Sequence, residues 1–525
     1  MSMCILSLSI AVSSPMAETD SLPAALPRVE TINRLPKVDL SAYRHTLPVH
    51  VAIAPSPLSK EAPPESYRGF VNLGMLLLFG NNIRLIIENY LKYGILISFP
   101  GSSVSKGDWT YTALTHIILP LNVLIAFSLE AWARKRAIGY RKRRSETIPQ
   151  PGAVAAGDFP DPKLTLQTTK RLDASARLEQ SIVGWLHALN ATAILVWPSI
   201  VTYYYIFHPF MAMSCVIAGC IQFFKMTSYA LVNHDFRAAY IFDKPREELG
   251  HVAKVHSDSV QVTNEEVYQY DIQYPDNITL KNMSYFWLAP TLCYQPSYPQ
   301  TKVFRKSFFF KRVLEILTCL GMMYFLTEQY ATPTLRNSVQ AFDQLAVASL
   351  VERVLKMSTT SVIIWLLMFY TVFHSCFNAL AEFLYFGDRH FYRSWWNAGN
   401  LQTYWKTWNL PMYTFFKRHA YLPMITSGVH PLVASIIVFT ISALLHEVVI
   451  GFPTHMLLGY AFAGMMCQIP LIAITQPLEK WRGPASGLGN MIFWVSFTIV
   501  GQPACAMLYY YHWTKRNMDA SASSV

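Results

Sequence analysis

Charged residues are scarce in this chain of 525 residues, where Asp, Glu, Lys and Arg together make up 14%. In a soluble globular protein about a quarter of the residues are charged. Hydrophobic residues make up 52% of the chain and aromatic residues 14%. The scarcity of charge argues against a soluble domain and indicates a protein that crosses a membrane several times.

The chain also lacks the spacings of disulfide frameworks, metal sites and serine hydrolases. Its eight cysteines are scattered and no two form a C-x-x-C pair, which argues against a disulfide framework or a structural zinc site. In HEVVI, Ile450 stands where a zinc-binding H-E-x-x-H helix has its second histidine. The chain contains no G-x-S-x-G elbow. A general base without a metal or a covalent nucleophile is left, and this chemistry suits an activated substrate such as a thioester.

Apolar runs recur along the chain, and a spanning helix needs about 20 mostly apolar residues. About nine runs qualify: 70–98, 110–132, 181–205, 210–232, 312–331, 359–386, 431–452, 456–475 and 488–511. The first carries Arg84, Glu88 and Lys92 on one helical face, so that face must look into protein or pair internally. The pattern predicts an all-α polytopic membrane protein.

The net charge of +11 is concentrated in the loops between these runs. With a cytosolic N-terminus, the loops after the second, fourth and sixth runs face the cytosol and are basic, as in RKRAIGYRKRR at 134–144. The opposite loop at 99–109 has only Lys106. This alternation follows the positive-inside rule and predicts a lumenal C-terminus. The basic charge therefore indicates topology and anionic-lipid contact, and no nucleic-acid partner is expected.

The remaining segments are polar or irregular. We expect residues 1–66 to be disordered, residues 513–525 to form a short lumenal tail, and the basic loop 133–180 to be partly disordered. The loop 233–311 contains YFWLAPTLCYQPSYPQT, which is too aromatic for a solvated linker and should pack against the membrane face. Asn277 and Asn282 match the glycosylation triplet. In a cytosolic loop they would stay unmodified.

The run 431–452 carries His446 and Glu447 side by side. An ionisable residue in a membrane span is costly and indicates a functional site. Neutral imidazole can act as a general base near neutral pH. Glu447 points about 100° away on a helix, so we expect it to support a polar network more than to form a dyad with His446.

A second candidate, Asn409, lies in TYWKTWNLP, a Trp-rich stretch with an interfacial composition. Pro411 predicts a helix break nearby, and from spacing alone Asn409 is best interpreted as a cap or turn residue. Lys406, Lys417 and Arg418 form a basic cluster on the same side. They could contact anionic headgroups or bind the phosphates of a nucleotide-like molecule.

Several motifs in a fixed order resemble those of one family. FYRSWWN at 391–397 is followed by WNLP and then by the His-Glu pair, and NNIRLIIENYLKYGILI, LAPTLCYQPSYPQT, FAGMMCQIP and GQPACAMLYYYH fit as well. The similarity extends from about Tyr67 to His512. The chain resembles the membrane-bound O-acyltransferase (MBOAT) superfamily, in the branch of sterol and type-1 diacylglycerol acyltransferases. LKYGIL and GQP favour the diacylglycerol members.

The resemblance implies an MBOAT membrane domain at 67–512, with about nine helices around an intramembrane reaction chamber. It implies an endoplasmic-reticulum enzyme that moves a fatty acyl group from acyl-CoA to 1,2-diacylglycerol and forms triacylglycerol. Acyl-CoA would be a co-substrate from the cytosol, with no bound cofactor or metal, and diacylglycerol would come from the bilayer. The resemblance also implies a homodimer or higher homo-oligomer, assembled with help from the N-terminal segment.

By motif match, His446 is the catalytic histidine and Asn409 the second signature residue. Residues implied to line the chamber or the thioester site are Trp408, Ser442, Glu447, Met465, Gln468 and Gln502. The chain departs from the family pattern at Ser394, where an acidic residue is usual, and at Tyr413, where a histidine is frequent.

Other functions are compatible with parts of this pattern. A sterol, a long-chain alcohol or retinol could replace diacylglycerol as the acceptor. The shape of the reaction chamber selects the acceptor, and the sequence shows that shape poorly. A proton-coupled transporter could use the His-Glu pair as a relay, but the chain shows no internal repeat, and the basic, Trp-rich stretch 389–430 would have no role. A catalytically dead lipid-binding homologue is a third alternative. The intact His446 and Asn409 argue against it, and Ser394 argues weakly for it.

Overall fold

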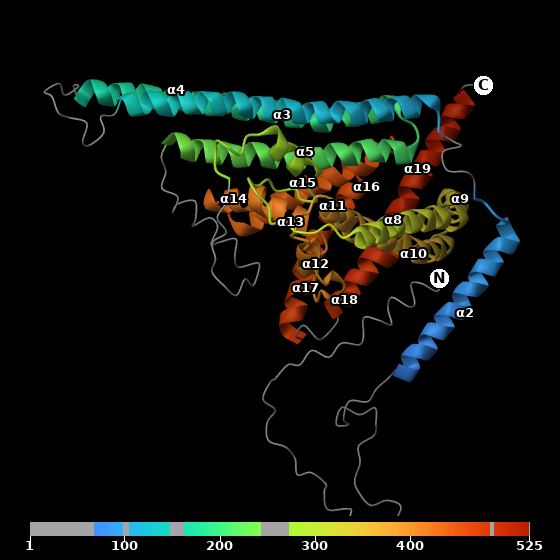
Figure 1. The fold of residues 1–525 in the computed structure, drawn as a ribbon. Coiled ribbons are helices and arrows are strands. Elements are labelled where there is room, and N and C mark those ends of the chain that lie inside the picture. The colour runs from blue at the N-terminus through green and yellow to red at the C-terminus, as the bar shows by residue number, and fades with distance from the viewer. Residues whose placement is uncertain (1–67, 98–103, 148–161, 243–271, 483–487, 524–525) are drawn as a thin grey trace, which may run out of the picture. The chain divides into compact units, whose positions relative to one another are not determined.

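The computed structural model of the protein describes residues 68–97, 104–147, 162–242, 272–482 and 488–523. The predicted disordered segment 1–66 lies outside these residues. The chain divides into two compact units, Met1–Leu85 and Ile86–Val525. Helix α2 (Arg68–Tyr93) begins in the first unit, and the remainder of the described fold belongs to the second (Figure 1).

The described residues are mainly helical, and their isolated β-bridge joins Gln300 and Phe386. Seven helices of the described ranges are long and apolar enough to cross a membrane. They cover Lys106–Thr147, Leu164–Tyr205, Pro209–Phe242, Val347–Phe383, Pro431–Gly451, Tyr460–Leu478 and Leu488–Arg516. The predicted runs 70–98 and 312–331 form helices α2 and α8 (Lys306–Leu326), which are not among those seven. The all-α polytopic fold is confirmed, whereas the count of nine is not.

Helices α3 (Lys106–Thr147) and α4 (Pro162–Tyr205) run side by side and are far longer than a membrane span (Figure 1). At about 1.5 Å per residue each exceeds 60 Å, against a hydrocarbon thickness of about 30 Å. The prediction of a partly disordered loop at 133–180 is therefore wrong for residues 133–147 and 162–180. The helices continue because their polar ends pair with each other, as in the ion pair of Arg136 with Glu179.

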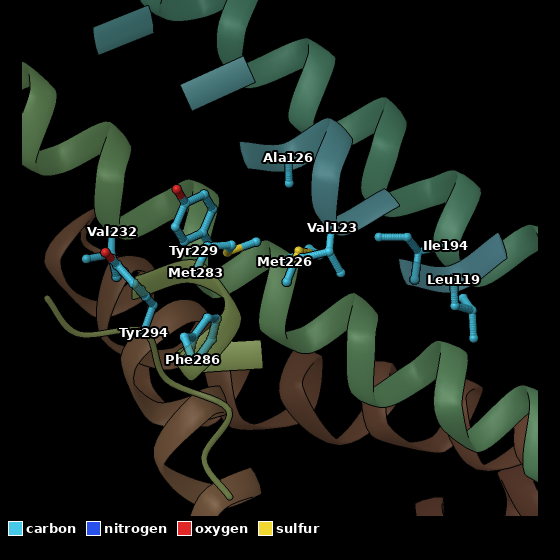
Figure 2. Packing of buried hydrophobic residues seen from close by; sticks show 10 residues of the cluster. All are labelled: Leu119, Val123, Ala126, Ile194, Met226, Tyr229, Val232, Met283, Phe286 and Tyr294. Carbon is cyan, nitrogen blue, oxygen red and sulfur yellow. The ribbon is translucent and has the colours of Figure 1, made fainter. Parts of the chain in front are cut away.

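Helix α5 (Pro209–Phe242) packs along α3 and α4. A buried polar network joins the three helices: Glu130 accepts from Arg237 at 2.5 Å and lies 3.0 Å from His187. Glu130 is fully buried and Arg237 is 3% exposed. Closer to the centre of α5 the contact is apolar, with residues of all three helices in one cluster (Figure 2).

The aromatic segment after α5 packs against protein. Phe286 of the short helix α7 (Leu280–Leu288) and Tyr294, which follows that helix, lie beside Tyr229 of α5 (Figure 2). Asn277 is 1% exposed and donates to Asn233 at 2.8 Å and to the Tyr294 hydroxyl at 3.1 Å. Both glycosylation-triplet asparagines form hydrogen bonds inside the protein, since Asn282 donates to the Pro296 carbonyl at 2.6 Å.

The rest of the unit, where the structure describes it, is a group of shorter helices with four π-helical turns. In order after α8 they are η3 (Thr327–Ala331), α9 (Thr332–Asp343), α10 (Val347–Phe369), η4 (Tyr370–Cys376), α11 (Phe377–Phe383), η5 (Trp395–Asn397), α12 (Leu401–Thr407), α13 (Leu410–Phe416), η6 (Lys417–Tyr421), α14 (Leu422–Thr426), α15 (Pro431–Gly451), α16 (Tyr460–Met466), α17 (Gln468–Arg482), α18 (Leu488–Phe493), η8 (Trp494–Gly501) and α19 (Gln502–Ser523). An aromatic cluster around Trp395 and Tyr404 joins α10, α12 and α18.

Helix α19 extends through most of the predicted C-terminal tail. It stays helical to Ser523, and Lys515 pairs with Asp343 of α9 at 2.9 Å. The segment 513–523 is therefore a helix with contacts to the domain. Its lumenal placement and the boundaries of the membrane domain stay predictions.

Candidate active site

Helix α15 presents three faces to three different neighbours. Its apolar face, with Leu445 and Val448, packs with α5 and α13 in one cluster. A second face carries Thr440, which contacts Met466 of the α16 helix through a 3.9 Å hydrogen bond to sulfur. A third face carries Phe439, whose ring lies 6.1 Å from that of Trp405 on α12. Between these contacts, Ile437, Ile441 and Leu444 are exposed, so part of the span has no protein cover among the described residues.

Helical spacing assigns the His-Glu pair to two of these faces. Residues seven apart lie on the same face of a helix. His446 and Ser442 therefore lie on the same face as Phe439, whose ring contacts Trp405 of α12. Glu447 lies on the face of Thr440, towards α16. The predicted separation of the two side chains follows directly from these positions.

His446 is half-buried, and one hydrogen bond orients its ring. The ring Nδ1 lies 2.7 Å from the carbonyl oxygen of Ser442. A carbonyl oxygen can only accept, so Nδ1 must carry the proton. In the neutral ring Nε2 then has a free lone pair and can accept a proton. Ser442 is thus brought together with His446, through its main chain.

Glu447 is a structural connector in this region. Its carboxylate accepts from the main-chain N–H of Gly459 at 2.8 Å and of Phe462 at 3.2 Å, which lie around the start of α16. It also accepts from the Tyr509 hydroxyl of α19 at 2.9 Å. Three donors from two other elements therefore converge on one side chain of α15. This agrees with the predicted polar network, and a direct role in substrate binding stays a prediction.

Asn409 forms the N-cap of α13. Its side-chain oxygen accepts from the N–H of Met412 at 3.1 Å, and α12 ends two residues earlier, as Pro411 predicted. The N–H of the next residue, Leu410, donates to the Phe391 carbonyl at 3.0 Å, which attaches the FYRSWWN segment. Met412 packs in the same cluster as Leu445 of α15. The cap interpretation is confirmed, and it places Asn409 on a helix that packs against the helix of His446.

Trp408 belongs to the aromatic cluster on α12. Its ring is parallel to that of Tyr404 at 6.1 Å and meets Phe373 of η4 at 5.5 Å. The Trp408 side chain therefore packs between α12 and η4. Trp405, which contacts α15 at Phe439, lies 6.0 Å from Trp408. Trp408 is thus connected to α15 through Trp405, which contacts both Trp408 and Phe439.

The residues near the C-terminus approach α15 from α16 and α19. Tyr460 bonds His512 and the Ala461 N–H bonds the Tyr509 hydroxyl, so the two helices run antiparallel. Met465, 7% exposed, therefore lies beside the part of α19 that precedes Tyr509. Gln502 lies on the same face of α19 as Tyr509, seven residues earlier. Its side-chain oxygen is buried and has no hydrogen-bond partner among the described residues.

Four other predicted residues lie on neighbouring elements. Gln468, at the start of α17, donates to the Gly464 carbonyl at 3.3 Å. Lys406 is exposed on α12, whereas Lys417 and Arg418 are half-buried in η6. The Arg418 guanidinium lies 3.5 Å from the Tyr294 carbonyl. The basic residues therefore occupy two separate elements, and their joint contact with phosphates stays a prediction.

The two residues that depart from the family pattern lie at a turn and on a helix. Ser394 precedes the 3₁₀ turn η5, where its carbonyl accepts from the Asn397 N–H at 3.1 Å. Tyr413 is half-buried on α13. Burial, with a smaller contribution from Tyr421, raises the pKa of the Tyr413 hydroxyl, so Tyr413 is a neutral residue at neutral pH.

A small, partly open pocket of about 20 Å³ lies away from His446. It is lined by α3, α4 and α5, including Arg136, Glu179 and Arg237. Within the described residues no group of three or more His, Cys, Asp or Glu side chains could hold a metal ion. The catalytic role of His446 stays a prediction.

Some residues of this site were missed from the sequence. Phe439, on the same face as His446, could have been found by counting seven residues back from His446, whereas Trp405 could not, because its contact with Phe439 depends on packing between helices. Tyr509 could not, because its place opposite Glu447 depends on how α19 packs. Ser228 of α5, which bonds His419 of η6 at 2.8 Å, gave no signal either, because it is far from the basic cluster in sequence.

These features define a multi-pass helical membrane protein with an oriented, half-buried histidine inside one of its spans. The chain belongs to the membrane-bound O-acyltransferase family, whose sequence profile matches residues 185–512.

Curated relatives extend the similarity over most of the chain. It is 35% identical to diacylglycerol O-acyltransferase 1A of Glycine max over 90% of this chain and 83% of the relative. It is 34% identical to diacylglycerol O-acyltransferase 1 of Arabidopsis thaliana, over 91% and 80% of the two chains. It is 32% identical to diacylglycerol O-acyltransferase 1 of Bos taurus, over 93% and 89%.

Proposed function

We propose that this protein is an acyl-CoA:diacylglycerol O-acyltransferase, which moves a fatty acyl group from acyl-CoA to the hydroxyl of 1,2-diacylglycerol and forms triacylglycerol. Relatives with that acceptor in their names match nine-tenths of the chain. The structural observation that carries the proposal is the bond from His446 Nδ1 to the Ser442 carbonyl. It leaves Nε2 as a proton acceptor inside an apolar span.

The proposed reaction is a direct transfer. His446 Nε2 takes the proton of the diacylglycerol hydroxyl while its oxygen attacks the thioester carbonyl. The carbon–oxygen bond of the new ester forms, the carbon–sulfur bond breaks, and the proton passes from His446 to the departing CoA sulfur. A general base of this kind contributes about 10²- to 10⁴-fold, and holding two lipids in register supplies a large part of the remainder.

The other residues have supporting roles in this proposal. Gln502 has a buried side-chain oxygen without a hydrogen-bond partner in the described part of the chain, and its amide group donates to the oxyanion that forms in the reaction. Asn409 holds the start of α13, which packs against α15. Trp408, Ser442, Met465 and Gln468 line the chamber, and Lys406, Lys417 and Arg418 contact the phosphates of CoA.

The proposal includes the cellular setting. The protein is an enzyme of the endoplasmic-reticulum membrane with a cytosolic N-terminus and a lumenal C-terminus, and it assembles as a homodimer or higher homo-oligomer. Acyl-CoA enters from the cytosol and diacylglycerol from the bilayer. The basic loops on the expected cytosolic side support this orientation.

A competition among acceptors tests the proposed function. Purified protein in detergent receives labelled oleoyl-CoA with diacylglycerol, cholesterol or a long-chain alcohol in parallel. We expect labelled triacylglycerol as the main product. Sterol ester or wax ester as the main product would replace the acceptor, and no product from any acceptor in folded protein would favour the transporter or the inactive homologue.

A further inference from the structure

A backbone segment lies between α5 and the basic turn η6. This segment, residues 289–298, follows α7 and is called the strap below. Its residue Tyr294 is fully buried. In the structure, Tyr294 is placed with Phe286 against Tyr229 and Val232 of α5 (Figure 2). The strap is therefore part of the core, although it has no regular secondary structure between Ala289 and Tyr298.

Two buried side chains of α5 hold the strap by its main chain. Lys225 donates to the carbonyl oxygens of Phe286 at 2.9 Å and of Ala289 at 2.6 Å, where α7 ends and the strap begins. A cation at a helix C-terminus satisfies carbonyls that lack partners within the helix. Ser228, fully buried and three residues further along α5, accepts from the Tyr294 N–H at 2.8 Å.

The side chain of Tyr294 is fixed as firmly as its main chain. Its ring packs edge-on against Tyr229 at 4.9 Å and Phe286 at 5.2 Å. Its hydroxyl donates to Asn282 at 2.7 Å and accepts from Asn277 at 3.1 Å. The Tyr294 main chain is therefore a rigid point at which another element can dock.

The basic turn η6 docks at this point. The Ser228 hydroxyl lies 2.8 Å from His419 Nε2 while it also accepts from the Tyr294 N–H. The neighbouring Arg418 reaches the Tyr294 carbonyl at 3.5 Å, and the His419 ring packs against Phe415 at 5.0 Å. One hydroxyl group of α5 thus contacts both the strap and the basic turn.

We infer that Ser228 is a positioning residue for acyl-CoA binding: through His419 and the strap it fixes the orientation of η6, so that Lys417 and Arg418 meet the phosphates of CoA. The inference rests on the proposed function. Long cationic side chains lose conformational freedom on binding, and a turn that is already fixed lowers that cost. A π-helical turn at this position agrees with the frequent use of such turns at functional sites.

A comparison of the full acyl carrier, CoA, with its shorter fragment pantetheine separates this role from a merely structural one. We would measure equilibrium binding of CoA and of pantetheine, which lacks the phosphates, and KM and kcat with oleoyl-CoA and oleoyl-pantetheine. For Ser228→Ala we expect about five-fold weaker CoA binding and a KM for oleoyl-CoA about five-fold higher, as for the loss of one hydrogen bond. Binding of pantetheine, KM for oleoyl-pantetheine and kcat should stay unchanged.

Matched variants control for folding. Ser199→Ala removes the same atoms from a buried serine of α4, whose hydroxyl donates within its own helix to the Leu195 carbonyl at 2.8 Å, and this variant should bind CoA as wild type does. His419→Phe should reproduce the effect of Ser228→Ala, while His419→Gln keeps a polar atom for Ser228 and should stay within two-fold of wild type. The His419 pair decides the question if Ser228→Ala fails to fold.

Equal changes with both donors, or wild-type binding of CoA by Ser228→Ala and His419→Phe, would overturn the inference. Binding is measured without turnover, so the two proposals can fail separately. Wild-type protein that binds CoA but transfers no acyl group would refute the proposed function, and the binding of the variants would still decide the role of Ser228.

Discussion

Replacing Glu447 by alanine removes the acceptor of three hydrogen bonds at once. Two of the donors are main-chain N–H groups, of Gly459 and Phe462, and the third is the Tyr509 hydroxyl. These groups connect α15 to the start of α16 and to α19. The substitution therefore tests whether Glu447 maintains the surroundings of His446 or acts on the substrate itself.

The magnitude follows from the number of donors. A hydrogen bond contributes about 0.5–1.5 kcal/mol, and a buried donor without a partner costs about 1–3 kcal/mol. Glu447 is half-buried, so we take the lower part of the range and expect Glu447→Ala to destabilise by about 3 kcal/mol. Glu447→Gln keeps one acceptor oxygen and should cost about 1–2 kcal/mol. Tyr509→Phe removes one donor and should cost about 1 kcal/mol.

Thermal unfolding in detergent, combined with acyl transfer, checks this order. The apparent melting temperature should fall most for Glu447→Ala, less for Glu447→Gln and least for Tyr509→Phe. Activity should fall in the same order, because the start of α16 loses its attachment. Loss of activity in Glu447→Ala with a wild-type melting temperature would refute the structural role and assign Glu447 to substrate contact.

Two further substitutions test the packing around the site. A Cβ atom at Gly489 would lie 2.0 Å from the Gly399 carbonyl oxygen, so Gly489→Ala should displace the loop after FYRSWWN and lower both the melting temperature and activity. Gly321→Ala has open space around its Cβ and should change neither. Equal behaviour of the two variants would contradict this contact. Glu130→Ala leaves the buried Arg237 without its carboxylate partner and should lower the stability of the fold by about 3–5 kcal/mol. Thermal unfolding measures this loss, and a wild-type melting temperature would contradict the buried network.

The all-α membrane fold could be predicted because apolar runs reveal spanning helices directly. Hydropathy could not show where helices end outside the bilayer. The basic run at 134–144 looks like a loop by composition, yet it is helical because α3 and α4 continue to pair beyond their apolar parts. In the same way, α19 continues to Ser523 through a segment that sequence marks as a tail.

The residues of the candidate site could be predicted where the sequence of a single helix or turn distinguishes them. His446 is conspicuous because its span has almost no other ionisable group, and Pro411 marks the break that Asn409 caps. Contacts between distant elements left no local signal. The Tyr509–Glu447 bond and the Ser228–His419 contact depend on the packing of helices far apart in the sequence.

The most direct test of the central proposal is acyl transfer by purified His446→Ala protein. Labelled oleoyl-CoA and diacylglycerol are supplied to wild type and variant, with the melting temperature and CoA binding measured in parallel. We predict that the variant keeps its fold and binds CoA but forms at least about 10²-fold less triacylglycerol. Triacylglycerol formation at the wild-type rate would contradict the assignment of His446 as the general base.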